Sequence, residues 1–241
     1  MGFLTERTLW EQGAKTWDDF LFDPRSFKTG SASRDSVVRE IERSRNALVS
    51  GVHQHFRQKL RQRHAWRALD AFPDATAYLD IETNGTAEPD NITMVGLADA
   101  EGFRCFIKGE NLESFRDAIS RYSVIVTFFG TGFDIPVIEK HFSHIQLDQI
   151  HVDLCPLFRG LGVRGGLKKI EKQFDIQRSE ETDGLTGYDA VLMWRRHLRG
   201  QSGILERLVS YNREDCVNMI PLADHALRMM RSHVKMDHGL S

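Results

Sequence analysis

The sequence predicts an α/β fold in which a mixed sheet is flanked by helices and preceded by a helical region. Between residues 76 and 107, three strand-like segments joined by short connections predict an antiparallel meander. Residues 124–129 form a continuous apolar run, which is typical of a strand covered on both faces. Segments with helical spacing of apolar residues alternate with this strand and with a later one, so we expect parallel strands to complete the sheet.

Length and composition are those of an ordinary globular protein. The 241 residues, 41% hydrophobic and 27% charged, suffice for one sizeable α/β domain plus an appendage. A formal net charge of −2 argues against a general polyanion binder, so affinity for nucleic acid would come from local basic patches and from metal ions. No segment has the apolar length of a membrane span, and the three cysteines are widely spaced, so we expect a cytoplasmic protein without disulfides.

Residues 1–72 are expected to form the helical region. Thr16 to Phe20 has the pattern of a capped helix start. Residues 33–70 carry the broken apolar stripe of one or two helices, with Gly51 as the expected weak point. Residues 34–70 contain nine lysines and arginines against four acids. These basic helices are either a solvated face or a surface that guides nucleic acid.

The sheet domain is expected over residues 73–231, and residues 232–241 are expected to be a flexible tail. Its expected strands lie at residues 76–83, 91–98, 103–107, 124–129 and 150–154. Its expected helices cover residues 111–122, 133–140, a segment from 165, 188–198 and 202–230. Pro136 suits the first turn of helix 133–140, so Asp134 is expected where the preceding strand gives way to this helix.

Two acids stand one residue apart on the first expected strand. The two-residue period of a strand places Asp80 and Glu82 on one face, with Leu79 and Ile81 on the other. Neighbouring carboxylates repel each other, and a fold normally avoids them unless a cation lies between them. The pair therefore indicates a cation site.

Asp134 and Asp215 are the expected partners of this pair. The carboxyl ends of strands are where α/β proteins place their sites, and Asp134 follows such an end. Asp215 lies on the last long helix, four residues after Tyr211 and hence on the same helix face. Four converging carboxylates would supply the hard oxygen ligands that Mg²⁺ or Mn²⁺ requires, and two such ions suit the hydrolysis of a phosphodiester.

These acids lie in three motifs, Asp80-Ile81-Glu82-Thr83, Phe133-Asp134 and Tyr211-Asn212-Arg213-Glu214-Asp215. Together they resemble the exonuclease motifs of the DEDD superfamily of 3′–5′ exonucleases, in the subclass with tyrosine in the third motif (DEDDy). The chain looks most like the bacterial predicted exonucleases with a ribonuclease-H-like fold. That family also tends to carry Leu-Trp and Trp-Asp-Asp-Phe patterns like Leu9-Trp10 and residues 17–20.

The resemblance implies a ribonuclease-H-like domain and a two-metal, metal-dependent 3′–5′ exonuclease that acts on single-stranded DNA or RNA ends. By that resemblance Asp80 would bridge two Mg²⁺ or Mn²⁺ ions, Glu82 and Asp215 would complete the first metal shell, and Asp134 would contact the second ion, mostly through water. Tyr211 would orient the attacking water.

Two alternatives stay open beside the exonuclease. A ribonuclease-H-like endonuclease also places acids on the first strand, the fourth strand and a late helix, and an inactive nucleic-acid-binding scaffold could keep the same fold. Phe129-Gly130 stands where the family often has Asn-Gly, so a contact to sugar or base would be lost or replaced by stacking on Phe128 or Phe129. Asp153 is expected to be a structural acid rather than a fifth ligand. The choice between DNA and RNA stays open.

Overall fold

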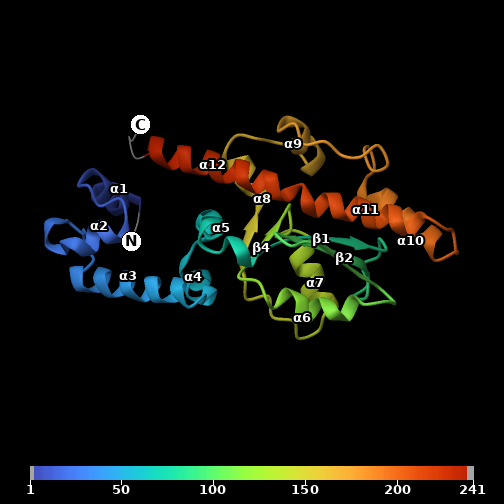
Figure 1. The fold of residues 1–241 in the computed structure, drawn as a ribbon, viewed down its shortest axis with the longest axis horizontal. Helices are drawn as coiled ribbons and strands as arrows, with labels where there is room; N and C mark the ends of the chain where they lie inside the picture. The colour runs from blue at the N-terminus through green and yellow to red at the C-terminus, as the bar shows by residue number, and fades with distance from the viewer. Residues whose placement is uncertain (1–2, 238–241) are drawn as a thin grey trace.

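The structure is a computed structural model that describes residues 3–237. The molecule is elongated, with the N-terminal helices at one end and helix α10 at the other (Figure 1). The helices of the N-terminal region are α1 (Phe3–Glu11), α2 (Trp17–Phe22), η1 (Pro24–Ser26), α3 (Arg34–Val49), α4 (His53–Lys59), η2 (Gln62–Arg67), α5 (Ala68–Ala71) and η3 (Pro73–Ala75).

Local sequence explains the ends of the first helices. Thr16 and Asp19 form the reciprocal capping box of α2, as the sequence predicts. Helix α3 ends just before Gly51, whose φ of +66° is a conformation that glycine adopts without strain. A small apolar core holds this region together, and it comprises Leu9, Ala14, Phe20, Val37 and Ile41.

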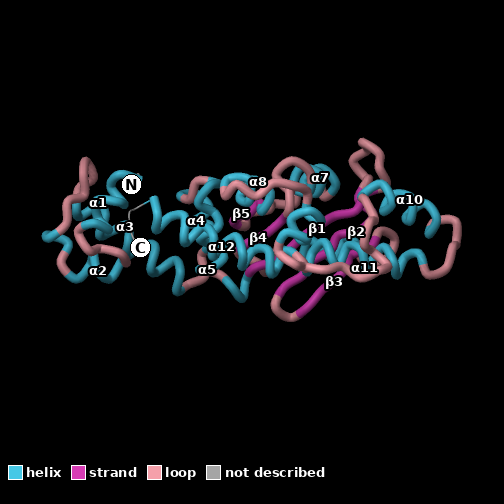
Figure 2. The backbone as a smooth tube through the Cα atoms, turned by 90° about the horizontal axis from the view of Figure 1, so that it is seen from above, coloured by secondary structure: helices cyan, strands magenta, loops and turns pink. Residues whose placement is uncertain are grey.

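Five strands form one mixed sheet in the order β3-β2-β1-β4-β5. The strands are β1 (Thr76–Thr83), β2 (Ile92–Asp99), β3 (Gly102–Ile107), β4 (Val124–Thr127) and β5 (Ile150–Asp153). β1, β2 and β3 pair as an antiparallel meander, while β1, β4 and β5 run parallel. The tube view in Figure 2 shows the strands lying between helices. The predicted α/β, ribonuclease-H-like arrangement of a mixed sheet flanked by helices is confirmed.

Helices cover both faces of the sheet. They are η4 (Leu112–Ser114), α6 (Phe115–Ile119), α7 (Asp134–His141), α8 (Leu154–Gly160), α9 (Leu167–Gln173), α10 (Gly187–His197), α11 (Ile204–Val217) and α12 (Met219–Asp237). α6 and α7 pack on the face that carries Leu79 and Ile81. α5, α8 and α12 pack on the opposite face of β4 and β5, while α10 and α11 cover β2 and β3. The face of β1 that carries Asp80 and Glu82 is therefore turned towards α11.

Two element boundaries differ from the sequence prediction. β4 ends at Thr127 instead of residue 129, because Phe129 has φ of +68° and cannot continue an extended strand. The predicted helix over 202–230 is two helices, α11 and α12, with the break at Asn218. Pro221 explains the break, because its ring would clash with the carbonyl of Val217 in an unbroken helix. α12 then runs through Asp237, into the stretch expected to be a tail.

Two further features of residues 3–237 bear on the expectations from sequence. All three cysteines are free, so no disulfide joins them. None of the helices in this part of the chain has the length and apolar character needed to cross a membrane.

Candidate metal centre

Strand β1 and helix α11 bring three of the four expected acids together. Carboxylate oxygens of Asp80, Glu82 and Asp215 lie within 4.8 Å of one another. Gly96, opposite Asp80 on β2, allows α11 to approach this closely. A Cβ atom at Gly96 would lie 2.0 Å from Asn212 Oδ1 and 2.8 Å from Cys216 Sγ, both on α11. The absence of a side chain at Gly96 thus sets the distance between the helix and the strand.

Asp134 is tied to the strand segment between the two β1 acids. It is the first residue of α7, and its Oδ1 accepts a hydrogen bond from the Ile81 backbone N at 3.2 Å. The side chain is buried. The structure therefore places the fourth expected acid beside Asp80 and Glu82, at the carboxyl end of β4, although it lies outside the group of three that is within 4.8 Å.

Positive charge from Arg178 and Lys168 offsets only part of the burial and mutual repulsion that raise the pKa values of these acids. Burial raises the pKa of Asp80 and of Glu82 well above the usual range, and the nearby carboxylates Asp215 and Asp134 raise both further. Burial also raises the pKa of Asp134, to about 7, and that of Asp215, against the lowering effect of Arg178. A bound cation would favour the ionised form of all four acids.

Arg178 and Glu171 form a buried ion pair beside Asp215, which the sequence motifs do not reveal. Arg178 Nη2 donates to Asp215 Oδ1 at 2.5 Å and to Glu171 Oε1 at 2.6 Å, while its Nε donates to Glu171 Oε2 at 2.7 Å. The side chains of Arg178 and Glu171 are 3% and 1% exposed. Asn218 also donates to Glu171 Oε1, at 3.1 Å. This pair fixes the orientation of the Asp215 carboxylate.

Asn212 holds the other side of the cluster. Its Nδ2 donates to Asp80 Oδ2 at 2.9 Å, and its side chain is fully buried between α11 and β2. Asn212 follows Tyr211 directly in the third motif, which is the only signal in the sequence that could have pointed to it. The contact limits rotation of the Asp80 side chain.

Tyr211 lies buried near the cluster, with its hydroxyl bound by a lysine. Lys168 Nζ donates to Tyr211 Oη at 2.8 Å and also donates to the Leu185 carbonyl. An ammonium group has no acceptor, so Tyr211 Oη must accept this bond and its own hydrogen remains available for another acceptor. Burial and the acids Asp215 and Glu82 raise the pKa of Tyr211, which keeps the phenol protonated. Tyr211 can therefore donate a hydrogen bond, and a phenol whose pKa is raised is a poor base.

Asp153 is a structural acid in this geometry. Its Oδ1 accepts from the backbone N of Phe129 at 2.8 Å and of Cys155 at 3.1 Å, and its Oδ2 accepts from Thr131 N at 3.0 Å. These bonds fix the loop between β4 and α7, which carries Phe129 in its left-handed conformation with the side chain 54% exposed. Asp153 thus acts on the site by shaping the loop that precedes Asp134.

The residues present fit a divalent metal ion. Three carboxylates converge, which is the hard oxygen donor set that Mg²⁺ or Mn²⁺ prefers. Glu82 Oε1 is buried and has no hydrogen-bond donor among the described residues. A buried carboxylate oxygen without a donor is costly, and a metal ion would remove that cost.

Comparison with known proteins gives a family match and a structural match. The family model RNase_H_2, described as RNase_H superfamily, matches residues 77–227. The family B DNA polymerase from the hyperthermophilic archaeon Pyrobaculum calidifontis is similar in structure, with a TM-score of 0.53 and 17% sequence identity over 63% of this chain. The match covers only 24% of the polymerase chain, and at this identity the likeness concerns the fold alone. A comparison with curated proteins found no match to this sequence.

The family match covers all of the sheet except Thr76, the first residue of β1, and includes every residue of the metal centre. RNase H-like nucleases use divalent metal ions, so the match supports a nuclease-type activity and binding of nucleic acid, in agreement with the acidic cluster. Since the match spans more than half of the sequence, the chain belongs to the RNase_H_2 family of the RNase H superfamily.

Proposed function

We propose that this chain is a metal-dependent 3′–5′ exonuclease of the DEDDy type, which hydrolyses phosphodiester bonds at single-stranded nucleic-acid ends by a two-metal mechanism. The observation that carries the proposal is the convergence of Asp80, Glu82 and Asp215, with Asp134 fixed beside them and a protonated tyrosine at the same site. The order and spacing of the motifs support the exonuclease subclass.

The proposed ligands are the four acids of the cluster. Asp80 would be shared by two Mg²⁺ or Mn²⁺ ions, Glu82 and Asp215 would complete the shell of one, and Asp134 would serve the other. The ions would supply a water of lowered pKa and would stabilise the charge on the leaving oxygen. The protein holds the ligands in place through Asn212 on Asp80 and Arg178 on Asp215.

The charge balance of the site supports two ions. The network holds five carboxylates, those of the four acids and of Glu171, against the two cations Lys168 and Arg178. Asp80 and Lys168 are half-buried, and the other side chains are buried. If all of these groups are ionised, the excess is about three negative charges, and a scissile phosphodiester adds one more. Two divalent cations bring this total to neutrality, whereas one leaves uncompensated charge in a buried site.

Tyr211 has a positioning role in this proposal. Its hydroxyl accepts from Lys168, so its hydrogen can be donated to the oxygen of the attacking water. Because its pKa is raised, the tyrosine keeps this hydrogen and does not take a proton from the water.

The test is digestion of matched 5′- and 3′-labelled single-stranded DNA and RNA with Mg²⁺, with Mn²⁺ and with chelator. Mononucleotide release from the 3′ end, lost in Asp80→Asn and Asp215→Asn, is the expected result. Glu139→Gln, an exposed acid on the same helix as Asp134, is the matched control and should keep full activity. Cleavage of a circular single strand would replace the exonuclease with an endonuclease. Unchanged digestion in either Asp variant would overturn the proposed site.

A further inference from the structure

A cleft in the N-terminal region lies apart from the metal centre. It has a volume of about 740 Å³, and all its lining residues fall between Glu6 and Arg67. It opens between α1 and α2 on one side and residues 59–67 on the other, with α3 between them, at the end of the molecule opposite α10 (Figure 1). Its volume is in the range of ligand-binding pockets.

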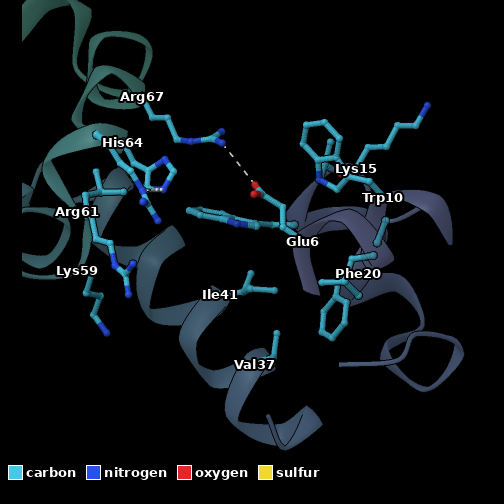
Figure 3. A pocket seen from close by; sticks show the side chains of 16 residues that line it. Glu6, Trp10, Lys15, Phe20, Val37, Ile41, Lys59, Arg61, His64 and Arg67 are labelled. Carbon is cyan, nitrogen blue, oxygen red and sulfur yellow. Dashed lines mark hydrogen bonds and ion pairs between the residues drawn. The ribbon is translucent and has the colours of Figure 1, made fainter. Parts of the chain in front are cut away.

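The walls of this cleft are cationic. Five lysines and arginines line it, namely Lys15, Lys59, Arg61, Arg63 and Arg67. Figure 3 shows Arg61 and Arg67 on one side of the cleft and Lys15 on the other, with the Lys15 side chain directed away from the two arginines. Glu6 is the one carboxylate among the lining residues, and it lies 3.5 Å from Arg67. Lys59 is also paired, since its Nζ lies 2.5 Å from Glu40 Oε1. Within residues 3–237, neither Lys15 nor Arg61 has a carboxylate within ion-pair distance, so these two charges are not neutralised by an ion pair.

His64 lies in the same wall, and its pKa is affected by the positive charges around it. Burial lowers the pKa of His64, and the neighbouring charges of Arg67 and Arg63 lower it further. A ligand that reduced the positive potential of these arginines would have to be anionic.

Indole rings accompany the cations. Trp10 and Trp17 both line the cleft, and the Trp17 residue is 39% exposed. Figure 3 shows Trp10 near Lys15, across the cleft from His64. Cationic side chains interleaved with accessible aromatic rings are the combination that binds single strands, because the charges contact phosphates while the rings stack on unpaired bases. A duplex would offer phosphates but no free base faces to the indoles.

We propose that this cleft binds a single-stranded segment of nucleic acid, away from the end that reaches the metal centre. The inference rests on the proposed function for the identity of the substrate, but the cleft can be tested without cleavage. Its role would be to hold long strands, so that a remote contact adds affinity without adding chemistry.

The first test is binding of a fluorescent 20-nucleotide single strand in chelator, across a series of salt concentrations. The variant Lys15→Glu/Arg61→Glu reverses one charge on each wall at positions without ion pairs. We expect affinity to fall at least about tenfold, and the slope of log K against log salt to lose about 1.4, since each phosphate contact on a single strand contributes roughly 0.7. Arg121→Glu/Arg199→Glu, with the same net charge at exposed positions outside the cleft, should bind like the wild type.

The second test separates stacking from charge. Trp17→Leu should weaken binding of the single strand by about 5- to 150-fold, the usual contribution of one base stacked on an aromatic ring. The salt slope should not change. If both cleft variants bind like the wild type, the proposal is overturned. It is equally overturned if an acidic peptide of equal charge competes as well as the oligonucleotide and Trp17→Leu has no effect, because the cleft would then suit an acidic protein segment.

Cleavage assays distinguish failure of this inference from failure of the proposed function. With the nuclease active, Lys15→Glu/Arg61→Glu should raise KM for the 20-nucleotide strand and leave kcat and the cleavage of a trinucleotide unchanged. An equal loss on both substrates would contradict a remote binding site. If the wild type binds the strand in this cleft but never cleaves it, the cleft proposal stands and the nuclease proposal falls.

Discussion

Replacing Arg178 with methionine tests whether the buried ion pair holds the acidic cluster together. The guanidinium donates to Glu171 and Asp215, and both carboxylates are buried. In Arg178→Met these two carboxylates lose the one cationic partner that either has within ion-pair distance among residues 3–237. Breaking a buried pair in this way costs about 3–5 kcal/mol. For a chain of this size, 1 kcal/mol corresponds to about 2–4 °C in Tm, so the expected loss is roughly 6–20 °C.

The assay is thermal and urea unfolding of the metal-free protein in chelator. Arg178→Met/Glu171→Leu removes both members of the pair and should recover part of the lost stability, because no unpaired charge remains at position 171 while Asp215 still lacks its partner. Arg231→Met breaks the exposed Arg231–Asp70 contact and should cost at most about 1 kcal/mol. If Arg178→Met unfolds within about 1 kcal/mol of the wild type, or if the double variant is no better than the single one, the reasoning is refuted.

The same variant should weaken metal binding. Arg178 occupies Asp215 Oδ1 and so limits rotation of the carboxylate, and in the proposed site Oδ2 would be the oxygen left for a metal ion. Loss of a partner that orients a metal ligand typically lowers metal affinity about 10- to 100-fold. Calorimetric titration with Mn²⁺ measures this, and unchanged affinity in a folded Arg178→Met protein would remove Arg178 from the account of the site.

Three further predictions concern other parts of the site. The pKa of Asp134, raised to about 7 from 3.8, means that the folded state binds this proton more tightly than the unfolded state, so stability of the metal-free protein should fall as pH rises from 4 to 7. In Asp134→Asn, the midpoint of urea unfolding should decrease less between pH 4 and pH 7 than it does in the wild type. Gly96→Ala should cost about 1–3 kcal/mol and abolish nuclease activity, because its Cβ would displace Asn212 from Asp80. Phe129→Asn should change stability by less than about 1 kcal/mol, since relief of left-handed strain offsets the lost contacts of a half-exposed ring.

Each of these predictions has a control and a result that contradicts it. Glu139→Gln should keep the wild-type pH dependence, and a steep fall retained in Asp134→Asn would show that other groups cause it. Gly160→Ala, where a Cβ would meet nothing within 4 Å, should be stable and active. A loss of 3 kcal/mol or more in Phe129→Asn, the cost of removing a core phenylalanine, would show that the ring is structural.

The sequence predicts the sheet well because its strands carry strong local signals. β1 occupies residues 76–83 as expected, and its alternation places Leu79 and Ile81 in the core opposite Asp80 and Glu82. Three of the four expected acids, Asp80, Glu82 and Asp215, lie close together in the structure, since a strand and a helix face have a fixed geometry. What local patterning cannot show is backbone conformation set by a distant group. The apolar run through Phe129 fits a strand, but Asp153 binds the Phe129 N–H and stabilises the turn there.

The position of Arg178 and Glu171 beside Asp215 could not be predicted from the sequence, for a related reason. Arg178 lies in an irregular segment between α9 and α10, where no periodicity gives a side chain its direction. Glu171 is one of several charged residues on a short helix, and nothing in the sequence indicates that it is buried while its neighbours are exposed. Only the packing of α9 against α11 and α12 buries this pair beside Asp215. Their role therefore depends on tertiary contacts between distant segments. Arg178 and Asp215, for example, are 37 residues apart in the sequence.

Hydrogen bonding separates the acids that suit a metal from those that do not, which sequence alone cannot do. Both oxygens of Asp153 accept backbone N–H groups, and both oxygens of Glu171 accept from Arg178. Those carboxylates are satisfied by the protein itself. Glu82 is buried to a similar degree, yet its Oε1 has no donor among the described residues. A buried carboxylate oxygen without a donor favours the neutral form unless a cation approaches it, so Glu82 is the acid whose ionised form would gain most from a metal ion.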